Sequence, residues 1–193
     1  MQHIIALSRT AIIVRHWFEI DLNDSSMEHG VRIEIRELPS QSRRGSESAA
    51  QLVTVDKPLW RADLFDRHSD PPGSFSVAHF HPEFRGNEPC PRVWDPQLNA
   101  DPWRWLEAQF ERLGAAEGGD PWTVDPADAA GLRRLGPVIV ATARQLGPQQ
   151  CTSAAQCFEL TRDVRDAVQL MLASLRRPDL LDEDWVTPWL AAA

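Results

Sequence analysis

The sequence predicts an α+β fold, in which an N-terminal antiparallel β-sheet of about five strands, connected as a meander, packs against C-terminal α-helices. Up to residue 95 apolar residues alternate with polar ones, and after it they recur at helical spacing. No helix of useful length separates the extended segments, so the crossovers of a parallel sheet are not expected. We expect one domain over 1–193, with a β-rich part over 1–95 and an α-helical part over 96–193.

The composition is that of a soluble globular protein, with 42% hydrophobic and 25% charged residues among 193. No apolar run approaches the roughly 20 residues of a membrane-spanning helix, so a membrane is not an expected partner. Twenty basic against 28 acidic residues give a net charge of −8. A free-standing nucleic-acid binder needs a basic surface to neutralise phosphates, and the sequence therefore argues against nucleic acid as a partner.

The cysteines and the N-terminus predict a cytoplasmic location. Cys90, Cys151 and Cys157 cannot all pair within one chain, and their spacing is not that of a structural zinc site. Reduced thiols are the simpler interpretation. The first residues also lack the basic region and continuous apolar stretch of a secretory signal.

The strands are predicted from alternation. Val31, Ile33 and Ile35 alternate with charged residues, as in a strand with one buried face. Alternation also marks residues 12–22. Residues 39–50 contain no apolar anchor and indicate a surface loop. Further extended segments are expected over 51–56, 59–66 and 75–81, the last two joined by a turn at 67–73 that contains Asp-Pro-Pro-Gly.

The helices are predicted from their end signals. Asp101-Pro102 provides an N-cap and a proline at the first helical position, and Gly114 can end that helix. Asp125-Pro126 repeats the start signal, and Gly136-Pro137 is expected to open a separate segment over 138–146. A long helix is expected over 153–176, followed by a tail over 179–193 whose two tryptophans favour a short docked helix.

One local group of residues points to chemistry. All six histidines lie in the β-rich part, and His79 and His81 are two apart in an extended segment. Such residues share a face and lie about 6–7 Å apart, so two imidazoles can bind one ion if a neighbouring strand adds a third ligand.

A third candidate ligand is found by pairing the extended segment 59–66 with the segment 75–81. If Phe65 pairs with Phe75, Arg61 faces His79, and Asp63 lies diagonal to His79. His79, His81 and Asp63 are then candidate ligands of a divalent transition metal, and Arg61 is placed to contact an anion. A slip of one residue would turn Asp63 to the other face.

The segment also partly resembles the metal motif of the cupins, since Gly73, His79 and His81 match its first part. The following acidic residues depart from that motif, because Glu83 comes too early and Glu88 too late. Helices rather than further barrel strands are expected next. No activity is therefore carried over from this resemblance.

A purely structural role is the alternative interpretation. The same side chains can form a hydrogen-bonded polar strip on one sheet face, above a core of apolar neighbours, or a metal-free acid–base site. Trp94 lies in a proline-rich connection, where an aromatic side chain can face a ligand or an interface. The candidate ligand-binding residues are therefore Arg61, Asp63, His79, His81 and Trp94.

Two functions remain open. The first is a non-catalytic module that binds another protein, a second copy or a small molecule, because no catalytic motif is present and both sheet faces carry apolar residues. The alternative is a metal-dependent enzyme or metal-binding protein centred on His79 and His81, in which the ion acts as a Lewis acid or a source of hydroxide.

Overall fold

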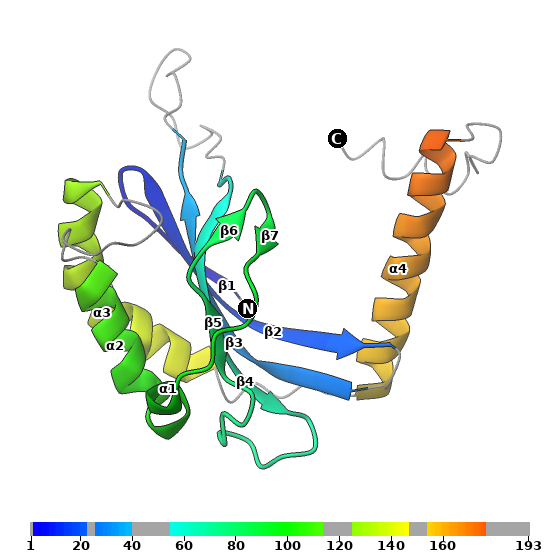
Figure 1. Cartoon of the computed structure of the whole chain (residues 1–193), viewed down its shortest axis with the longest axis horizontal. Coiled ribbons are helices and arrows are strands. Elements are labelled where there is room, and N and C mark those ends of the chain that lie inside the picture. The colour runs from blue at the N-terminus through cyan, green and yellow to red at the C-terminus, as the bar shows by residue number, and fades with distance from the viewer. Residues whose placement is uncertain (1, 23–25, 40–54, 114–124, 147–153, 177–193) are drawn as a thin grey trace. The chain divides into compact units, whose positions relative to one another are not determined.

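The computed structural model describes residues 2–22, 26–39, 55–113, 125–146 and 154–176 (Figure 1). The chain divides into two compact units, one formed by Met1–Glu19 with Ser26–Gln150 and the other by Ile20–Ser25 with Cys151–Ala193. The first unit contains nearly all of the strands and three helices, and the second contains the last helix. A single folding domain over the whole chain stays a prediction.

A five-stranded antiparallel sheet confirms the predicted meander, because its strands follow one another in sequence order. Two very short strands form a separate hairpin after it. The strands are β1 (Gln2–Ala6), β2 (Thr10–Asp21), β3 (Ser26–Glu37), β4 (Pro58–Arg67), β5 (His79–His81), β6 (Phe84–Arg85) and β7 (Glu88–Pro89). The strand expected over 51–56 falls largely outside the described residues.

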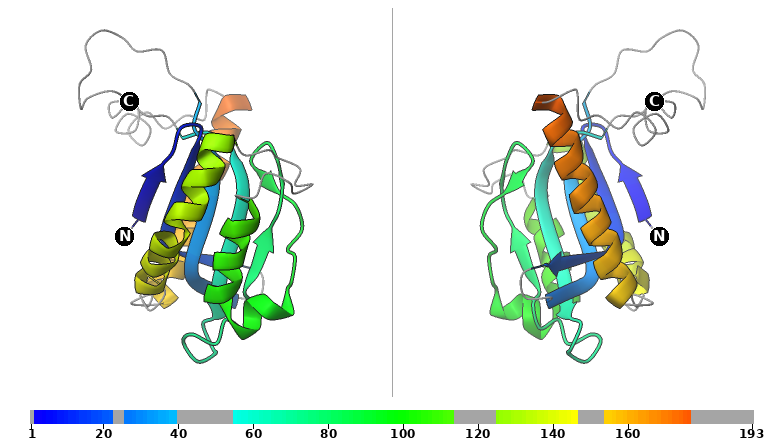
Figure 2. Two further views of the ribbon diagram at one scale, coloured as in Figure 1. Left: turned by 90° about the vertical axis from the view of Figure 1, so that its left-hand side faces the viewer. Right: turned by 90° about the vertical axis from the view of Figure 1, so that its right-hand side faces the viewer.

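One face of the sheet is apolar and covered by helices. The period-two alternation places Val31, Ile33 and Ile35 on this face, and all three are fully buried. Trp60 of β4 stacks on Trp105 of the helical layer, with ring centroids 6.2 Å apart. The layer consists of α1 (Pro96–Ala100), α2 (Pro102–Leu113) and α3 (Pro126–Leu146), and Figure 2 shows α2 and α3 in front of the sheet. The α+β class is thus confirmed.

The helices begin at the predicted signals. The Asp101 carboxylate accepts the Arg104 N–H at 3.1 Å, and the Asp125 carboxylate accepts the Ala127 N–H at 2.9 Å. The prediction that Gly136-Pro137 separates two segments was wrong, because α3 continues through it. Residues on both sides of Pro137 contribute to the same buried stripe against the sheet, so tertiary packing outweighs the missing backbone hydrogen bond.

A buried carboxylate joins α3 to the first hairpin. Asp128 accepts hydrogen bonds from the backbone N–H groups of Ser8 and Arg9 at 2.7 and 2.8 Å, and from the Thr10 hydroxyl at 2.8 Å. Burial acts to raise the pKa of Asp128, but these hydrogen bonds outweigh it and lower the pKa. The turn between β1 and β2 is therefore fixed to the start of α3.

The opposite face of the sheet is polar and yet buried. Arg32 and Glu34 are each only 4% exposed, so the expectation that their side of β3 faces solvent was wrong. Each forms an ion pair: Arg32 pairs with Asp63, and Oε2 of Glu34 lies 3.1 Å from Nη2 of Arg15 in β2. Ion pairing and hydrogen bonding allow these groups to leave water.

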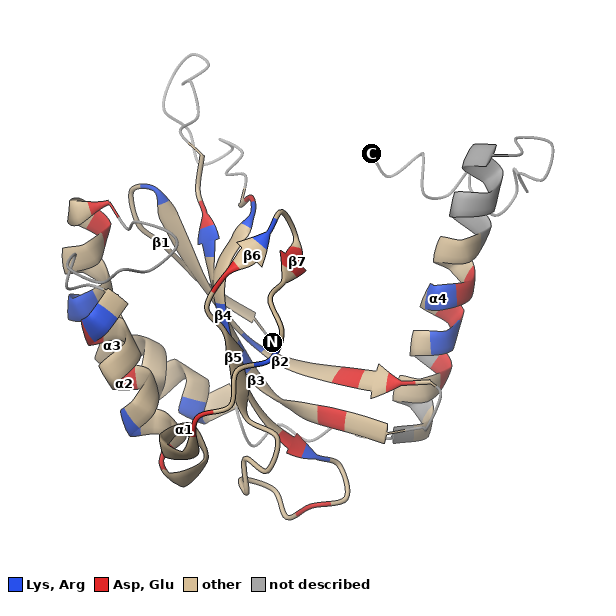
Figure 3. Cartoon of the chain, viewed as in Figure 1, with Lys and Arg blue, Asp and Glu red and all other residues tan. Residues whose placement is uncertain are grey.

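The last helix, α4 (Ala154–Arg176), confirms the prediction of a long helix over 153–176 to within one residue. Its described part carries intermixed acidic and basic residues (Figure 3), and Val164 and Val168 are 54% and 42% exposed. Residues 179–193, where a short helix was expected, lie outside the described residues. None of the helices that the structure describes is long and apolar enough to cross a bilayer.

Candidate metal centre

The pairing of β4 with β5 brings the predicted ligands together on the polar face. Asp63 lies directly opposite His79, and Arg61 lies opposite His81. The predicted register was two residues off, because it placed Arg61 opposite His79. A shift of two residues preserves the face of every side chain, and the three candidate ligands therefore still share one face.

The register differs because the connection between the strands is longer than expected. Residues 75–78 form turns rather than a strand: Phe75 has a φ of 50°, and the Ala78 N–H donates to the Phe75 carbonyl. The Asp66 carboxylate stabilises this connection, since it accepts the Gly73 N–H at 2.6 Å, the Ser74 hydroxyl at 2.9 Å and the Phe75 N–H. The last strand accordingly begins only at His79.

Both histidine rings are oriented by backbone carbonyls. Nδ1 of His79 lies 2.8 Å from the Val77 oxygen, and Nδ1 of His81 lies 2.6 Å from the Cys90 oxygen. A carbonyl only accepts hydrogen bonds, so each Nδ1 carries the proton. In the neutral ring Nε2 then presents a bare lone pair. Metal-binding histidines usually have this arrangement: one ring nitrogen binds the metal, and the other donates its N–H to a carbonyl or carboxylate.

The two Nε2 atoms converge on one carboxylate oxygen. Oδ2 of Asp63 lies 3.4 Å from Nε2 of His79 and 3.9 Å from Nε2 of His81. One ligand atom from each of the three residues lies within 4.8 Å of the others, and this is the one such group among the described residues. Asp63 and His79 are fully buried, and Nε2 of His79 has no hydrogen-bond partner.

Two arginines keep Asp63 ionised. Nε and Nη2 of Arg32 donate to its two oxygens at 2.6 and 3.1 Å, and Nε of Arg61 lies 3.0 Å from Oδ2. Burial acts to raise the pKa of Asp63, but the hydrogen bonds and charge of Arg32, together with the charge of Arg61, outweigh it and hold the pKa well below the usual range of a carboxyl. The site therefore contains a permanent anionic ligand.

His81 is held neutral. Burial is the largest effect and lowers its pKa to about 4, and Arg61 and His79 act in the same direction. The Cys90 carbonyl and Asp63 oppose this shift without reversing it. A neutral imidazole is the form that binds a metal ion, because a protonated ring has no free lone pair.

Arg61 places a positive charge beside Nε2 of His81 and the carboxylate of Asp63. Its Nη2 donates to Nε2 of His81 at 3.0 Å while its Nε contacts Asp63. The side chain is 13% exposed, and its guanidinium lies 5.7 Å from the ring centroid of Phe84. Arg61 therefore contacts two of the three candidate ligands and is itself slightly exposed.

Trp94 lies beside the same group. Its ring centroid is 5.4 Å from that of His79, and the residue is 52% exposed. Phe65 also makes an edge contact with the His79 ring, with the ring centroids 6.3 Å apart. All five residues singled out from the sequence thus lie in one region of the polar face.

Sequence reasoning missed Arg32 and Glu19. Arg32 binds both oxygens of Asp63 and also donates to Glu19, whose other oxygen accepts from Arg92 at 3.2 Å. The available signal was the position of Arg32 in β3, next to the strand of Asp63 and on the same face once the sheet order is known. The charged residues of β3 were instead expected to face water.

Compared with known proteins, the chain matches no family model, no curated protein and no solved structure. The cupin resemblance of the His79 segment therefore has no support at the level of the whole chain. The feature of the chain that points to a function is the geometry of Asp63, His79 and His81.

Proposed function

We propose that this protein is a binding module whose ligand is a divalent transition-metal ion held by Asp63, His79 and His81. The observation that supports this proposal best is the buried Nε2 of His79, which has no hydrogen-bond partner and faces an ionised carboxylate oxygen 3.4 Å away. A lone pair and a carboxylate oxygen at this distance repel each other unless a positive charge lies between or beside them.

The distances suit one ion after small adjustments. Metal bonds to histidine nitrogen and carboxylate oxygen are about 2.0–2.2 Å long, so ligands of one ion lie about 3–4 Å apart. The two nitrogen–oxygen distances of 3.4 and 3.9 Å already fall in this range. A small rotation of the imidazole rings brings the two nitrogens closer together.

Metal binding exchanges one cation for another. The ion takes the position that the Arg61 guanidinium now occupies beside Asp63 and His81, and Arg61 turns toward the surface. Three protein ligands leave further coordination positions for water or a small anion. Arg61 is then available to contact such an anion, and the half-exposed Trp94 lies beside His79.

The composition supports the remaining parts of the proposal. We infer a cytoplasmic protein, in which the ligands are not exposed to an oxidising compartment and the thiol of Cys90 stays reduced. A metal-dependent enzyme remains the second candidate function, because the open coordination positions are those that a substrate or an activated water uses.

The experiment is metal loading of the purified, untagged protein. The protein is incubated with Zn²⁺, freed of unbound metal and analysed for its metal content, in parallel with the double variant His79→Ala/His81→Ala. We expect about one equivalent of zinc in the wild type and none in the variant, because three ligands bind one ion and one ligand does not hold it.

The matched control is the double variant His16→Ala/His29→Ala, which removes two other histidines of the sheet and keeps all three proposed ligands. It is expected to keep one equivalent of zinc. The proposal is wrong if the wild type retains no metal, or if His79→Ala/His81→Ala retains as much as the control. Circular dichroism of each variant checks that loss of metal is not loss of the fold.

A further inference from the structure

The two edges of the sheet differ in how they are covered. At the β5 edge, the N–H of Phe80 donates to the Val93 carbonyl at 3.0 Å, and the N–H of Val93 donates back at 2.9 Å. At the other edge, β1 has a neighbouring strand on one side only among the described residues. Among the described residues, no strand pairs with the backbone groups on the outer edge of β1.

The hairpin fixes which groups these are. The N–H of Leu7 donates to the Thr10 carbonyl at 2.8 Å, so Leu7 belongs to a hydrogen-bonded pair with β2. Because such pairs alternate along an antiparallel ladder without a bulge, Ile5 and His3 also point their backbone groups toward β2. The N–H and C=O groups of Gln2, Ile4 and Ala6 then point outward.

The side chains of β1 do nothing to protect this edge. Natural sheets usually guard a free edge with lysine, proline or a bulge, and Gln2–Ala6 contains none of these and no charged carboxylate. Ile4, the central residue, is 53% exposed. An uncharged, exposed and regular edge strand is typical of a strand that pairs with another chain.

We propose that β1 pairs with β1 of a second copy of this chain in antiparallel orientation, with Ile4 opposite Ile4 on a two-fold axis. Gln2 of each copy then lies opposite Ala6 of the other. All three outward-pointing residues fall in hydrogen-bonded pairs in this register, and each pair exchanges two N–H···O bonds. The register is thus self-complementary, as a two-fold interface requires, and it joins two five-stranded sheets into one.

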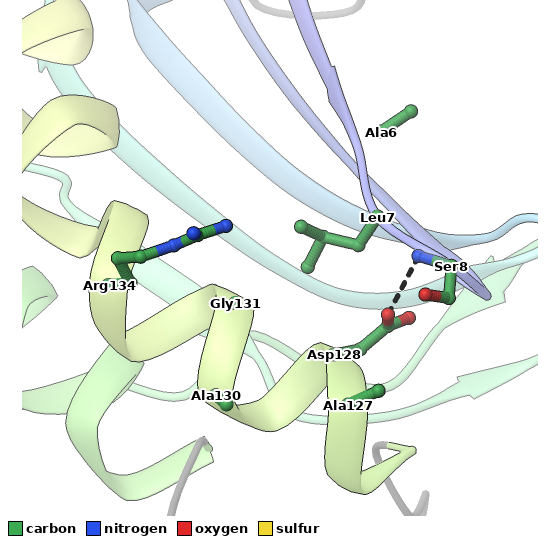
Figure 4. Close-up of a pocket in the computed structure, with 8 residues that line it drawn as sticks. All are labelled: Ala6, Leu7, Ser8, Ala127, Asp128, Ala130, Gly131 and Arg134. Atoms are coloured by element: carbon green, nitrogen blue, oxygen red, sulfur yellow. Dashed lines mark hydrogen bonds between the residues drawn. The ribbon is translucent and has the colours of Figure 1, made fainter.

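The end of β1 lies beside a groove. A groove with a volume of about 540 Å³ runs between the end of β1 and the first turns of α3. Figure 4 shows Ala6, Leu7 and Ser8 on one side of this groove and Gly131 and Arg134 on the other. The residues of α3 that line this groove include the small residues Ala127, Ala130 and Gly131.

The first test removes the hydrogen bonds of the central Ile4–Ile4 pair and keeps the hydrogen bonds between β1 and β2. In Ile4→Pro the lost N–H is the one that points outward, and proline is tolerated at such edge positions. Light scattering over a range of protein concentrations is expected to give a mass of twice 21.8 kDa for the wild type and the monomer mass for Ile4→Pro. The matched control Ile4→Val keeps the N–H and is expected to remain dimeric.

A second test measures which residues of the two β1 strands lie opposite each other. Residues that pair across an antiparallel ladder in a hydrogen-bonded pair have Cα atoms about 5.5 Å apart, within the range that a disulfide spans. Ile4→Cys is therefore expected to form a crosslinked dimer on mild oxidation. Gln2→Cys, on the same face of the same strand, lies opposite Ala6 and far from its own copy, and is expected to show only the background of the native thiols.

Two results would overturn the proposal. One is a monomer mass for the wild type at every concentration up to its solubility limit. The other is a dimer that persists in Ile4→Pro and in which Gln2→Cys crosslinks as fully as Ile4→Cys, because that dimer uses another surface or another register. Neither result depends on whether the protein binds a metal ion.

Discussion

Two groups of histidines in this sheet look alike in ring spacing and differ in their nearest carboxylate. The rings of His79 and His81 lie 5.2 Å apart, and the ring of His29 lies 6.0 Å from His16 and 5.6 Å from His68. Asp63 directs an ionised oxygen at the first pair. Asp66, the carboxylate near the second group, already binds the backbone and side chain of the loop at 73–75. Proximity of imidazoles is therefore not sufficient to make a candidate site, since a carboxylate oxygen must also point toward their nitrogens.

The largest expected difference between the two groups concerns stability. Asp63→Asn leaves Arg32 buried without its main partner, and breaking a buried ion pair in this way costs about 3–5 kcal/mol. Asp66→Asn weakens hydrogen bonds of a partly exposed loop and is expected to cost about 1–3 kcal/mol. Urea unfolding of both variants measures these losses. Equal losses would mean that the charge of Asp63 has no special structural role.

The next effect concerns metal affinity. Arg61→Met removes the guanidinium that competes with the ion and is expected to raise zinc affinity about tenfold or more, since freeing two charge-assisted contacts saves roughly 1.5–3 kcal/mol. Calorimetric titration with Zn²⁺ measures the change. Arg15→Met is the matched control, because Arg15 lies on the same face and pairs with Glu34 instead. A lower affinity in Arg61→Met would contradict the proposed exchange of cations.

The second histidine group makes stability depend on pH. Burial is the main cause that lowers the pKa of both His16 and His29, and the neighbouring histidine lowers each further. The N-terminus also lowers the pKa of His16, while Asp66 opposes the shift at His29. The unfolded chain therefore binds more protons, and the free energy of unfolding falls as the pH decreases through 6.5.

The variant His29→Leu checks this pH dependence. Urea unfolding at neutral and mildly acidic pH is expected to show a smaller loss of stability on acidification in His29→Leu than in the wild type. Removing the ring takes away the proton uptake of His29 and the repulsion between its charged form and His16 or His68. Parallel losses in the two proteins would show that His29 does not contribute to the acid sensitivity.

The smallest effect is expected at Trp94. Because this side chain is half exposed and contacts His79 at one ring only, Trp94→Ala should change the free energy of unfolding by less than about 1 kcal/mol. The same urea experiment measures it. A larger loss would mean that Trp94 holds His79 in place rather than covering it.

The candidate site could be predicted because it depends on which face of the sheet each side chain occupies, and this follows from whether its position in the strand is odd or even. It depends much less on the exact pairing of the two strands. The faces of Asp63, His79 and His81 follow from their odd positions in two adjacent strands, and a register error of two residues leaves them together. The register itself was not predictable from local propensity. It is set by the Asp66 carboxylate, whose hydrogen bonds hold residues 73–75 in a turn.

The remaining errors have one common cause, which is tertiary packing. Pro137 is a helix-breaking signal that the buried stripe of α3 outweighs. Arg32 and Glu34 look solvent-exposed when β3 is considered alone, and only the neighbouring strands supply the opposite charges that allow them to be buried. Alternation predicts which residues share a face, but the partners on that face come from elsewhere in the chain.

The buried carboxylate of Asp128 has a consequence for the order of events during synthesis. Its hydrogen-bond donors in the first hairpin precede it by 118 to 120 residues. Until a ribosome has translated the start of α3, the turn at Ser8 and Arg9 lacks its acceptor, and closing so large a loop is entropically costly. The N-terminal hairpin is therefore a late-docking element, and the nascent chain exposes the first strand longer than its position in the sequence suggests.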